Sequence, residues 1–356
     1  MAERIRVGII GQGRSGRDIH AHALATVVPG LYEIVAVADL QQERCDRAVK
    51  ELGCKAYTDY RKLFAHEDID LIVNASPSHL HVPITLEALE AGFNVLCEKP
   101  VARRAKEVDG IVAKARKKGR LLAAFQQSRF APYFLKVREL IDSGVLGRVV
   151  MIKISFSGFA RRWDWQTLQD HNGGNLLNTG PHPVDQALQL IGTDAMPRVS
   201  CLMDRAVTFG DAEDHVKVIL SRPGRPTVDI EISSCNPYNL FTYQVLGTQG
   251  GLTGTMDRLE WKWFDPAQAP QQHLTAEPLP GPSYCTETLP WQTGSWEAPK
   301  SGLSLFDTMA KPFYENLHAA LTEGAPLAVP MEHVRLQIAV IEECHRQAPL
   351  PRRSPP

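Results

Sequence analysis

The feature that most constrains this chain is a glycine-rich stretch near its start, Gly11-Gln12-Gly13-Arg14-Ser15-Gly16. It directly follows a β-rich run, Ile5–Ile10, and precedes apolar residues that recur at helical spacing. Glycines permit a sharp turn from strand to helix, and the N–H groups at the start of such a helix attract phosphate. The pattern predicts a βα unit that cradles a dinucleotide pyrophosphate through Gly11, Gln12, Gly13, Arg14 and Ser15.

The rest of the first 125 residues alternates between strand and helix patterns. We expect strands at 33–38, 70–74, 94–97 and 121–125, and helices at 41–52, 82–91 and 104–118. Strands separated by helices are typical of βαβ units and of a parallel, doubly wound sheet. We therefore predict an α/β Rossmann domain over residues 1–125.

The pattern changes after Gln126. Apolar runs at 149–154, 216–220, 227–232 and 242–246 are separated by loops, which predicts an antiparallel sheet in an α+β domain over residues 126–348. Residues 264–302 are rich in Pro, Gln and Thr, and we expect long loops or an irregular insertion there. Two helices are expected at 306–321 and 331–346, followed by a disordered tail at 349–356.

Composition excludes several classes of function. The formal net charge of the 356 residues is -1, so no general attraction to nucleic acid or anionic membranes is expected. The seven cysteines are scattered without a C-x-x-C pair, which argues against disulfides and against a metal site. Only Met1–Arg4 precede the first apolar run, and no apolar stretch approaches membrane-spanning length. We expect a cytoplasmic protein without nucleic-acid or membrane partners.

The second predicted strand ends next to Asp39, about 20 residues beyond the glycine-rich loop. An acid at this place accepts hydrogen bonds from the adenosine ribose hydroxyls and repels a 2'-phosphate. The spacing therefore predicts NAD as the cofactor, in preference to NADP. The alternative for Asp39 alone is an exposed acid that caps the next helix.

Several further motifs carry a family resemblance. They are Ala75-Ser76-Pro77-Ser78-His79-Leu80-His81, Cys97-Glu98-Lys99-Pro100, Arg129-Phe130-x-Pro132, Gly144-x-x-Gly147, and the segment from Gly173-Gly174 to Asp185. Over nearly its whole length the chain resembles the glucose–fructose oxidoreductase and inositol dehydrogenase family (Gfo/Idh/MocA). The resemblance implies an NAD-dependent dehydrogenase acting on CH–OH groups. It also implies a large, open, mostly antiparallel C-terminal sheet that mediates homo-oligomerisation, as a dimer or tetramer.

Ser76-Pro77 and Glu98-Lys99 both lie just beyond predicted strand ends, where open α/β sheets bind ligands. A partly desolvated lysine beside a cationic nicotinamide has a lowered pKa and can exchange a proton with a substrate hydroxyl. We expect Lys99 to be catalytic and to contact both substrate and cofactor; otherwise it is a surface lysine. The cofactor set then also includes Ser76, Pro77, His81 and Glu98, with a structural hydrogen bond as the alternative role for His81.

The resemblance places a second group of catalytic and substrate-binding residues in Gly173–Asp185. His182 is implied to face the carbon that gives up hydride, where a neutral imidazole takes the hydroxyl proton. Asp185 is the family's last acid in the segment. Asn178 stands where the family usually has an aspartate, and an amide supplies no charge to the His182 imidazole. This favours Lys99 as the proton acceptor. The alternative for His182 is packing between domains.

The remaining predicted contacts surround that segment. Trp163, Asp164 and Trp165 resemble the family's aromatic segment, in which tryptophan faces suit the C–H faces of a sugar. Arg129 matches a recurrent arginine, with substrate contact and an interdomain salt bridge as equal alternatives. Gln127, next to Gln126 at the domain junction, is expected at the nicotinamide amide. Tyr238 is a further candidate for the pocket.

Together these features predict oxidation of a secondary alcohol of a sugar, glycoside or cyclitol to a ketone, by hydride transfer to nicotinamide. One alternative is an enzyme that retains NAD and cleaves a glycoside through transient oxidation and elimination. Another is a non-enzymatic NAD-binding sensor on the same fold.

Overall fold

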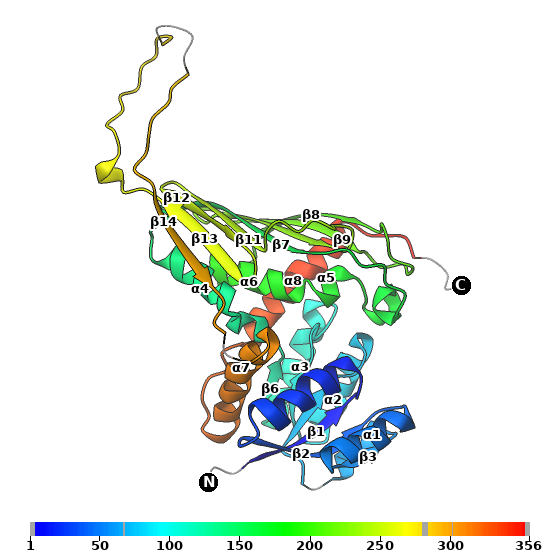
Figure 1. Cartoon of the computed structure of the whole chain (residues 1–356). Helices are drawn as coiled ribbons and strands as arrows, with labels where there is room; N and C mark the ends of the chain where they lie inside the picture. Colours follow the sequence, from blue (N-terminus) through cyan, green and yellow to red (C-terminus); the bar gives the residue numbers. More distant parts are fainter. Residues whose placement is uncertain (1–3, 67, 280–283, 301, 353–356) are drawn as a thin grey trace.

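Two β-sheets organise the chain, and helices lie on both faces of the first and between the two (Figure 1). The computed structural model describes residues 4–66, 68–279, 284–300 and 302–352. The first sheet has six parallel strands in the order β3-β2-β1-β4-β5-β6. They are β1 (Ile5–Ile10), β2 (Tyr32–Ala38), β3 (Lys55–Tyr57), β4 (Leu71–Asn74), β5 (Asn94–Cys97) and β6 (Leu122–Ala124).

The first sheet confirms the predicted Rossmann fold. Its central strands β1 and β4 are apolar runs with Val7, Ile9 and Leu71 fully buried, because helices cover both faces of a parallel sheet. The strand order reverses between β1 and β4, which is where such sheets bind ligands. Strand β3 was not predicted, since it is a half-exposed edge strand of three residues.

The helical segments of this half follow the expected order. They are η1 (Arg14–Ala21), η2 (Ala23–Val27), α1 (Gln42–Leu52), η3 (Tyr60–Ala65), η4 (Ser78–Leu80), α2 (His81–Glu90) and α3 (Ala105–Lys118). Helices α1 and α3 end at Gly53 and Gly119, whose φ angles of 67° and 61° are readily adopted only by glycine.

The second sheet has eight strands in the order β14-β13-β12-β11-β7-β10-β9-β8. Only the β7–β10 pair is parallel, so the predicted mostly antiparallel sheet is confirmed. Its strands are β7 (Val149–Ser157), β8 (Arg198–Asp204), β9 (His215–Ser221), β10 (Thr227–Ser233), β11 (Tyr243–Gly247), β12 (Gly250–Gly254), β13 (Arg258–Trp263) and β14 (Gln292–Glu297).

The prediction of irregular structure throughout 264–302 was wrong at β14. This strand, QTGSWE, has no apolar alternation, and its pairing with β13 defines it. Between β13 and β14 the chain leaves the sheet as a long arm, whose described residues 264–279 and 284–291 project away from the rest of the molecule (Figure 1).

Helices lie on the side of the second sheet that faces the Rossmann domain (Figure 1). Strand β9 shows the reason, because Val216, Val218 and Leu220 are fully buried while the residues between them are partly exposed. The helical segments are η5 (Gln127–Phe130), α4 (Pro132–Asp142), η6 (Trp165–Thr167), η7 (Gln169–His171), α5 (Asn175–Asn178), α6 (Pro181–Ile191), η8 (Pro266–Gln268), α7 (Leu305–Thr322) and α8 (Met331–Gln347).

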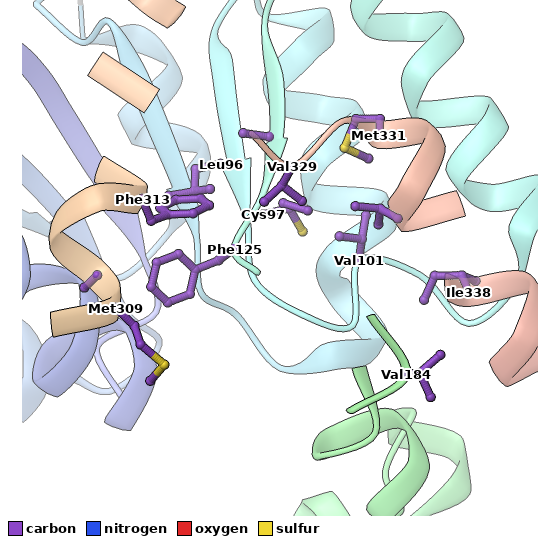
Figure 2. Packing of buried hydrophobic residues seen from close by; sticks show 14 of the residues in the cluster. Leu96, Cys97, Val101, Phe125, Val184, Met309, Phe313, Val329, Met331 and Ile338 are labelled. Atoms are coloured by element: carbon purple, nitrogen blue, oxygen red, sulfur yellow. The ribbon is translucent and has the colours of Figure 1, made fainter. Parts of the chain in front are cut away.

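The C-terminal helices return to the first half of the chain. Figure 2 shows Phe125, which follows β6, beside Met309 and Phe313 of α7, and the Phe125 and Phe313 ring centroids are 4.9 Å apart. Helix α8 packs on α3. The boundary at residue 125 stays a prediction, and the packing of the Rossmann half extends across it.

The first residues of the predicted disordered tail make contacts, since Arg205 donates to the Pro351 carbonyl over 3.1 Å. Residues 353–356 lie outside the described residues. No helix in the described part of the chain is both long and apolar enough to cross a bilayer.

Candidate active site

The glycine-rich loop lies against the loop that follows β4. Gly11 has a φ of 93°, and a Cβ atom there would lie 2.4 Å from the Ala75 carbonyl oxygen. A Cβ on Gly16 would lie 1.8 Å from the Gly11 carbonyl oxygen. Both contacts are too short for any side chain, so the loop is held by positions that only glycine can occupy.

Asp39 is fixed beside this loop at the end of β2. Its Oδ2 accepts from the Gln12 backbone N–H at 2.7 Å, and its Oδ1 accepts from the Gln41 N–H at 2.9 Å. The Arg44 guanidinium lies 3.3 Å from Oδ2. The carboxylate therefore joins the loop to the residues before α1, and its predicted contact with the adenosine ribose stays a prediction.

The loop fits a dinucleotide by its chemistry. Helix η1 begins at Arg14, and its first N–H groups lie at the positive end of the helix dipole. Gln127 is buried, and its Oε1 has no hydrogen-bond partner among the described residues. An unpaired buried acceptor is costly, and a carboxamide NH2 group of nicotinamide would satisfy it. Gly13, Arg14 and Ser15 would hold the pyrophosphate, and Gln127 the nicotinamide.

His81 connects two loops at the edge of the sheet. Its Nε2 lies 2.8 Å from the Ser76 carbonyl oxygen and its Nδ1 lies 2.7 Å from the Pro100 carbonyl oxygen. Burial lowers the pKa of the ring, and a neutral imidazole donates to one carbonyl at a time. His81 therefore makes the structural hydrogen bonds that were the alternative to a contact with the cofactor. It positions Ser76, which with the exposed Pro77 forms the rim of the site.

Lys99 reaches from the end of β5 to the second half of the chain. Its Nζ donates to the Asn178 carbonyl oxygen over 2.7 Å. Burial lowers the pKa of Lys99; the charge of Glu98 opposes this, and the charges of Arg14 and Arg162 add to it. Lys99 is thus not a free surface lysine, and it lies between the cofactor loop and the predicted substrate segment.

Glu98 lies beneath Lys99 with 3% of its surface exposed. Its Oε2 accepts from the Lys99 backbone N–H at 2.9 Å, and its Oε1 lies 3.2 Å from His20 Nε2. Both oxygens are engaged within the protein, so Glu98 supports the site from behind and does not face a ligand.

His182 lies at the start of α6, with Nδ1 2.9 Å from the Ser128 hydroxyl. Burial and the nearby charge of Lys99 lower the pKa of His182 to about 3, so the ring is neutral at physiological pH. No hydrogen bond joins Nε2 to the described residues, and this nitrogen is available to a substrate. The side-chain amide of Asn178 is likewise without a hydrogen bond to the described part of the chain.

Other predicted substrate contacts lie elsewhere. Arg129 and Asp185 form a buried bidentate pair, with Nε–Oδ2 at 3.0 Å and Nη2–Oδ1 at 2.5 Å. They are 7% and 1% exposed, so a substrate contact for either is corrected to an internal salt bridge. Trp163 and Tyr238 are 80% and 82% exposed, so their predicted contact with a substrate stays a prediction. Asp164 pairs with Arg162 at 2.5 Å, and Trp165 is partly buried.

Ser128 and His20 were missed by the sequence analysis. A serine after Gln127 has no distinctive spacing, and only its contact with His182 shows its role. His20 had a weak signal, since it is a polar residue on the buried side of the helix that the glycine-rich loop opens. No group of three or more His, Cys, Asp or Glu residues able to hold a metal ion occurs among the described residues.

Comparison with known proteins agrees with this architecture. Residues 5–126 match the oxidoreductase family with an NAD-binding Rossmann fold (GFO_IDH_MocA), and residues 134–253 match the GFO/IDH/MocA C-terminal domain. The trans-1,2-dihydrobenzene-1,2-diol dehydrogenase of Mus musculus is 31% identical, over 69% of this chain and 73% of its own. The scyllo-inositol 2-dehydrogenase (NADP(+)) IolW of Bacillus subtilis is 24% identical, over 96% and 92%.

A solved structure extends the comparison to the fold. The WlbA dehydrogenase from Bordetella pertussis, in complex with NADH and UDP-GlcNAcA, has a TM-score of 0.77 and 22% identity. The match covers 97% of this chain and 96% of that one. With both domains matched in order and the predicted motifs at one sheet edge, the chain belongs to the Gfo/Idh/MocA family of oxidoreductases with an NAD-binding Rossmann fold.

Proposed function

We propose that this protein oxidises a secondary alcohol of a sugar, glycoside or cyclitol to the ketone, with NAD as the hydride acceptor. The observation that carries the proposal is the position of Lys99. It lies at the carboxyl edge of the Rossmann sheet, with its ammonium 2.7 Å from Asn178 and its charge felt by His182. A proton acceptor (Lys99), a neutral imidazole (His182) and the glycine-rich loop thus serve one proposed site.

Lys99 is the better candidate to take the hydroxyl proton. A histidine with a pKa of about 3 is a weak base, whereas a lysine of lowered pKa approaches the useful range. His182 then serves through Nε2, which orients the reacting oxygen while Ser128 holds Nδ1. This division of roles between Lys99 and His182 suits the chain, because Asn178 supplies no negative charge that would make the His182 imidazole a stronger base.

The cofactor, when bound, accepts the hydride at its nicotinamide ring. Asp39 supports NAD over NADP, because a carboxylate next to the glycine-rich loop at the end of β2 would repel a 2'-phosphate. The polyol class rests on relatives, since one is named as an inositol dehydrogenase and a similar structure holds UDP-GlcNAcA. The proposed homo-oligomer rests on the family resemblance, and the cytoplasmic location on the seven free cysteines.

The test is NADH formation with a panel of cyclitols, monosaccharides and aryl glycosides. We expect at least one polyol to give steady NADH production, and Lys99→Met to lower kcat by about 10²–10⁴-fold, the range for loss of a general base. NADH binding, measured by fluorescence, should persist in this variant. The exposed Lys62→Met is the matched control and should behave like the unaltered protein.

Two outcomes would contradict the proposal. Release of free sugar without net NADH would favour cleavage by transient oxidation and elimination. Unchanged turnover in a Lys99→Met, His182→Ala double variant would remove both residues from the catalytic site.

A further inference from the structure

A line of three buried side chains runs from the Lys99 loop to the C-terminal helix α7. His20, with no exposed surface, lies between Glu98 and Tyr314. Its Nε2 is 3.2 Å from Glu98 Oε1, and its Nδ1 is 2.5 Å from the Tyr314 hydroxyl oxygen. Phe125 packs on the imidazole with ring centroids 4.5 Å apart. The His20 ring is thus sealed from water, and its two nitrogens have only Glu98 and Tyr314 as partners among the described residues.

The hydrogen bonds in this line all donate toward Glu98, from Tyr314 to His20 and from His20 to Glu98. Glu98 Oε2 accepts the Lys99 backbone N–H, and an ionised Glu98 needs a second donor at Oε1. His20 Nε2–H is that donor, so in a neutral ring Nδ1 carries no proton and accepts from Tyr314. Burial raises the pKa of Tyr314, which keeps its hydroxyl protonated as the donor. The reverse order would turn the Nε2 lone pair toward a carboxylate.

The line determines the charge beneath Lys99. Burial alone would raise the pKa of Glu98, but the hydrogen bond from His20 and the charge of Lys99 lower it below its usual range. The charges that act on the Lys99 ammonium are those of Glu98, Arg14 and Arg162, while the nearby His182 is neutral. Glu98 is the only one of these four that favours the charged ammonium, because the two arginines repel it.

We propose that His20 and Tyr314 are positioning residues, which keep Glu98 ionised beneath Lys99 and so set how readily Lys99 exchanges its proton. This rests on the proposed function, in which Lys99 accepts the substrate proton. Neither residue belongs to the cofactor loop or the substrate segment, and Tyr314 comes from a helix 294 positions along the chain from His20.

Tyr314→Phe removes only the hydroxyl at the end of the line. The matched control is Tyr32→Phe, since the Tyr32 hydroxyl is also buried and donates to the Tyr314 backbone oxygen over 2.7 Å, outside the line. In the cofactor-free protein with ¹⁵N-labelled histidine, NMR should show His20 as the Nε2–H tautomer. We expect the Nδ1 resonance of His20, which reports the hydrogen bond from Tyr314, to change in Tyr314→Phe and to persist in Tyr32→Phe.

The same variants are then compared by the pH profile of kcat/KM for alcohol oxidation. Loss of ionised Glu98 lowers the pKa of Lys99, so the acid limb of the profile should move to lower pH by about one unit. Glu98→Gln should move it the same way, and its combination with Tyr314→Phe should add little further shift. Tyr32→Phe should leave the limb in place.

The outcomes separate the two proposals. An unchanged His20 Nδ1 resonance and an unmoved acid limb in Tyr314→Phe would overturn the positioning role. Absence of any polyol oxidation by the unaltered protein would overturn the proposed function, while the tautomer still tests the line. If Tyr314→Phe fails to fold, two variants of His20 replace it. His20→Gln keeps a donor for Glu98 and should leave the acid limb in place, whereas His20→Leu should shift the limb. Equal pH profiles for the two variants would contradict the proposal.

Discussion

Asp39 and Arg44 contact one another beside the glycine-rich loop, at the position predicted for the adenosine ribose of a dinucleotide. The carboxylate, 8% exposed, is held by two backbone N–H groups, while the Arg44 guanidinium is 37% exposed. Arg44 also approaches the glycine-rich loop, because its Nη1 would lie 3.7 Å from a Cβ atom on Gly13. One side chain repels a 2'-phosphate and the other attracts it.

Asp39→Ala should therefore shift the cofactor preference toward NADP. With the carboxylate gone, Arg44 is free to pair with a 2'-phosphate, and the ratio of the NADPH to NADH dissociation constants should fall by about 10-fold or more, or about 1.4 kcal/mol. Fluorescence titration of both reduced cofactors measures it. Adding Arg44→Ala should reverse the gain for NADPH; an unchanged ratio in Asp39→Ala would exclude this pair as the selectivity determinant.

At the scale of elements, the buried pair Arg129–Asp185 joins η5 to α6, and so joins the Gln127 segment to the helix that begins next to His182. Arg129 also donates to the Ala328 carbonyl at 2.8 Å, which connects the segment before α8. A buried ion pair adds little by itself, but removal of one partner leaves an uncompensated charge.

Asp185→Asn should lower the free energy of unfolding by about 3–5 kcal/mol, because Arg129 remains charged and buried. Urea denaturation followed by fluorescence measures the change. The control is Asp194→Asn, which breaks the pair with Arg222 on a carboxylate that is 71% exposed and should cost at most about 1 kcal/mol. Equal losses in the two variants would show that burial of the Arg129 pair is not decisive.

Some helices and strands could be predicted from the sequence and others could not. Strands β4 and β5 are continuous apolar runs and helices α1, α3, α7 and α8 have apolar residues at helical spacing, and the ends of all six were predicted to within a residue or two. Strands β3 and β14 were among those missed, because edge strands with polar residues are defined by their partners. In the site, local motifs marked the glycine loop, Lys99 and His182. They did not mark Ser128, His20 or Tyr314, and they did not show that Arg129 and Asp185 pair with each other, since these contacts join distant segments.

At the scale of the whole molecule, the described residues of the arm, 264–279 and 284–291, are largely exposed. Leu274 and Tyr284 are 102% and 91% exposed, and a hydrogen bond from Gln272 to Glu287 at 3.1 Å joins the two limbs of the arm. Phe264 and Trp291 close its base, with ring centroids 5.5 Å apart. Large apolar side chains exposed in this way are typical of contact with another protein, and a second copy of this chain fits the proposed homo-oligomer.

Replacement of residues 266–290 by a short Gly-Ser turn should weaken self-association. Burial of one leucine and one tyrosine contributes about 3 kcal/mol or more, so dissociation should be favoured by at least about 100-fold. Sedimentation velocity over a range of concentrations measures this. NADH affinity should not change, because the arm lies far from the glycine loop (Figure 1). An identical assembly with and without the arm would assign self-association to the sheet alone.

Helix α7 has a consequence for how the protein can be made. Its Tyr314, Phe313 and Met309 complete the packing around Phe125, His20 and Tyr32, so the first 125 residues lack part of their interior until the ribosome has passed residue 322. We therefore expect the dinucleotide-binding half to be poorly expressed without α7. A shortened gene product that ends before α7 would expose Phe125 and leave His20 without its contact with Tyr314, so domain exchange with a relative should carry α7 along with the N-terminal sheet.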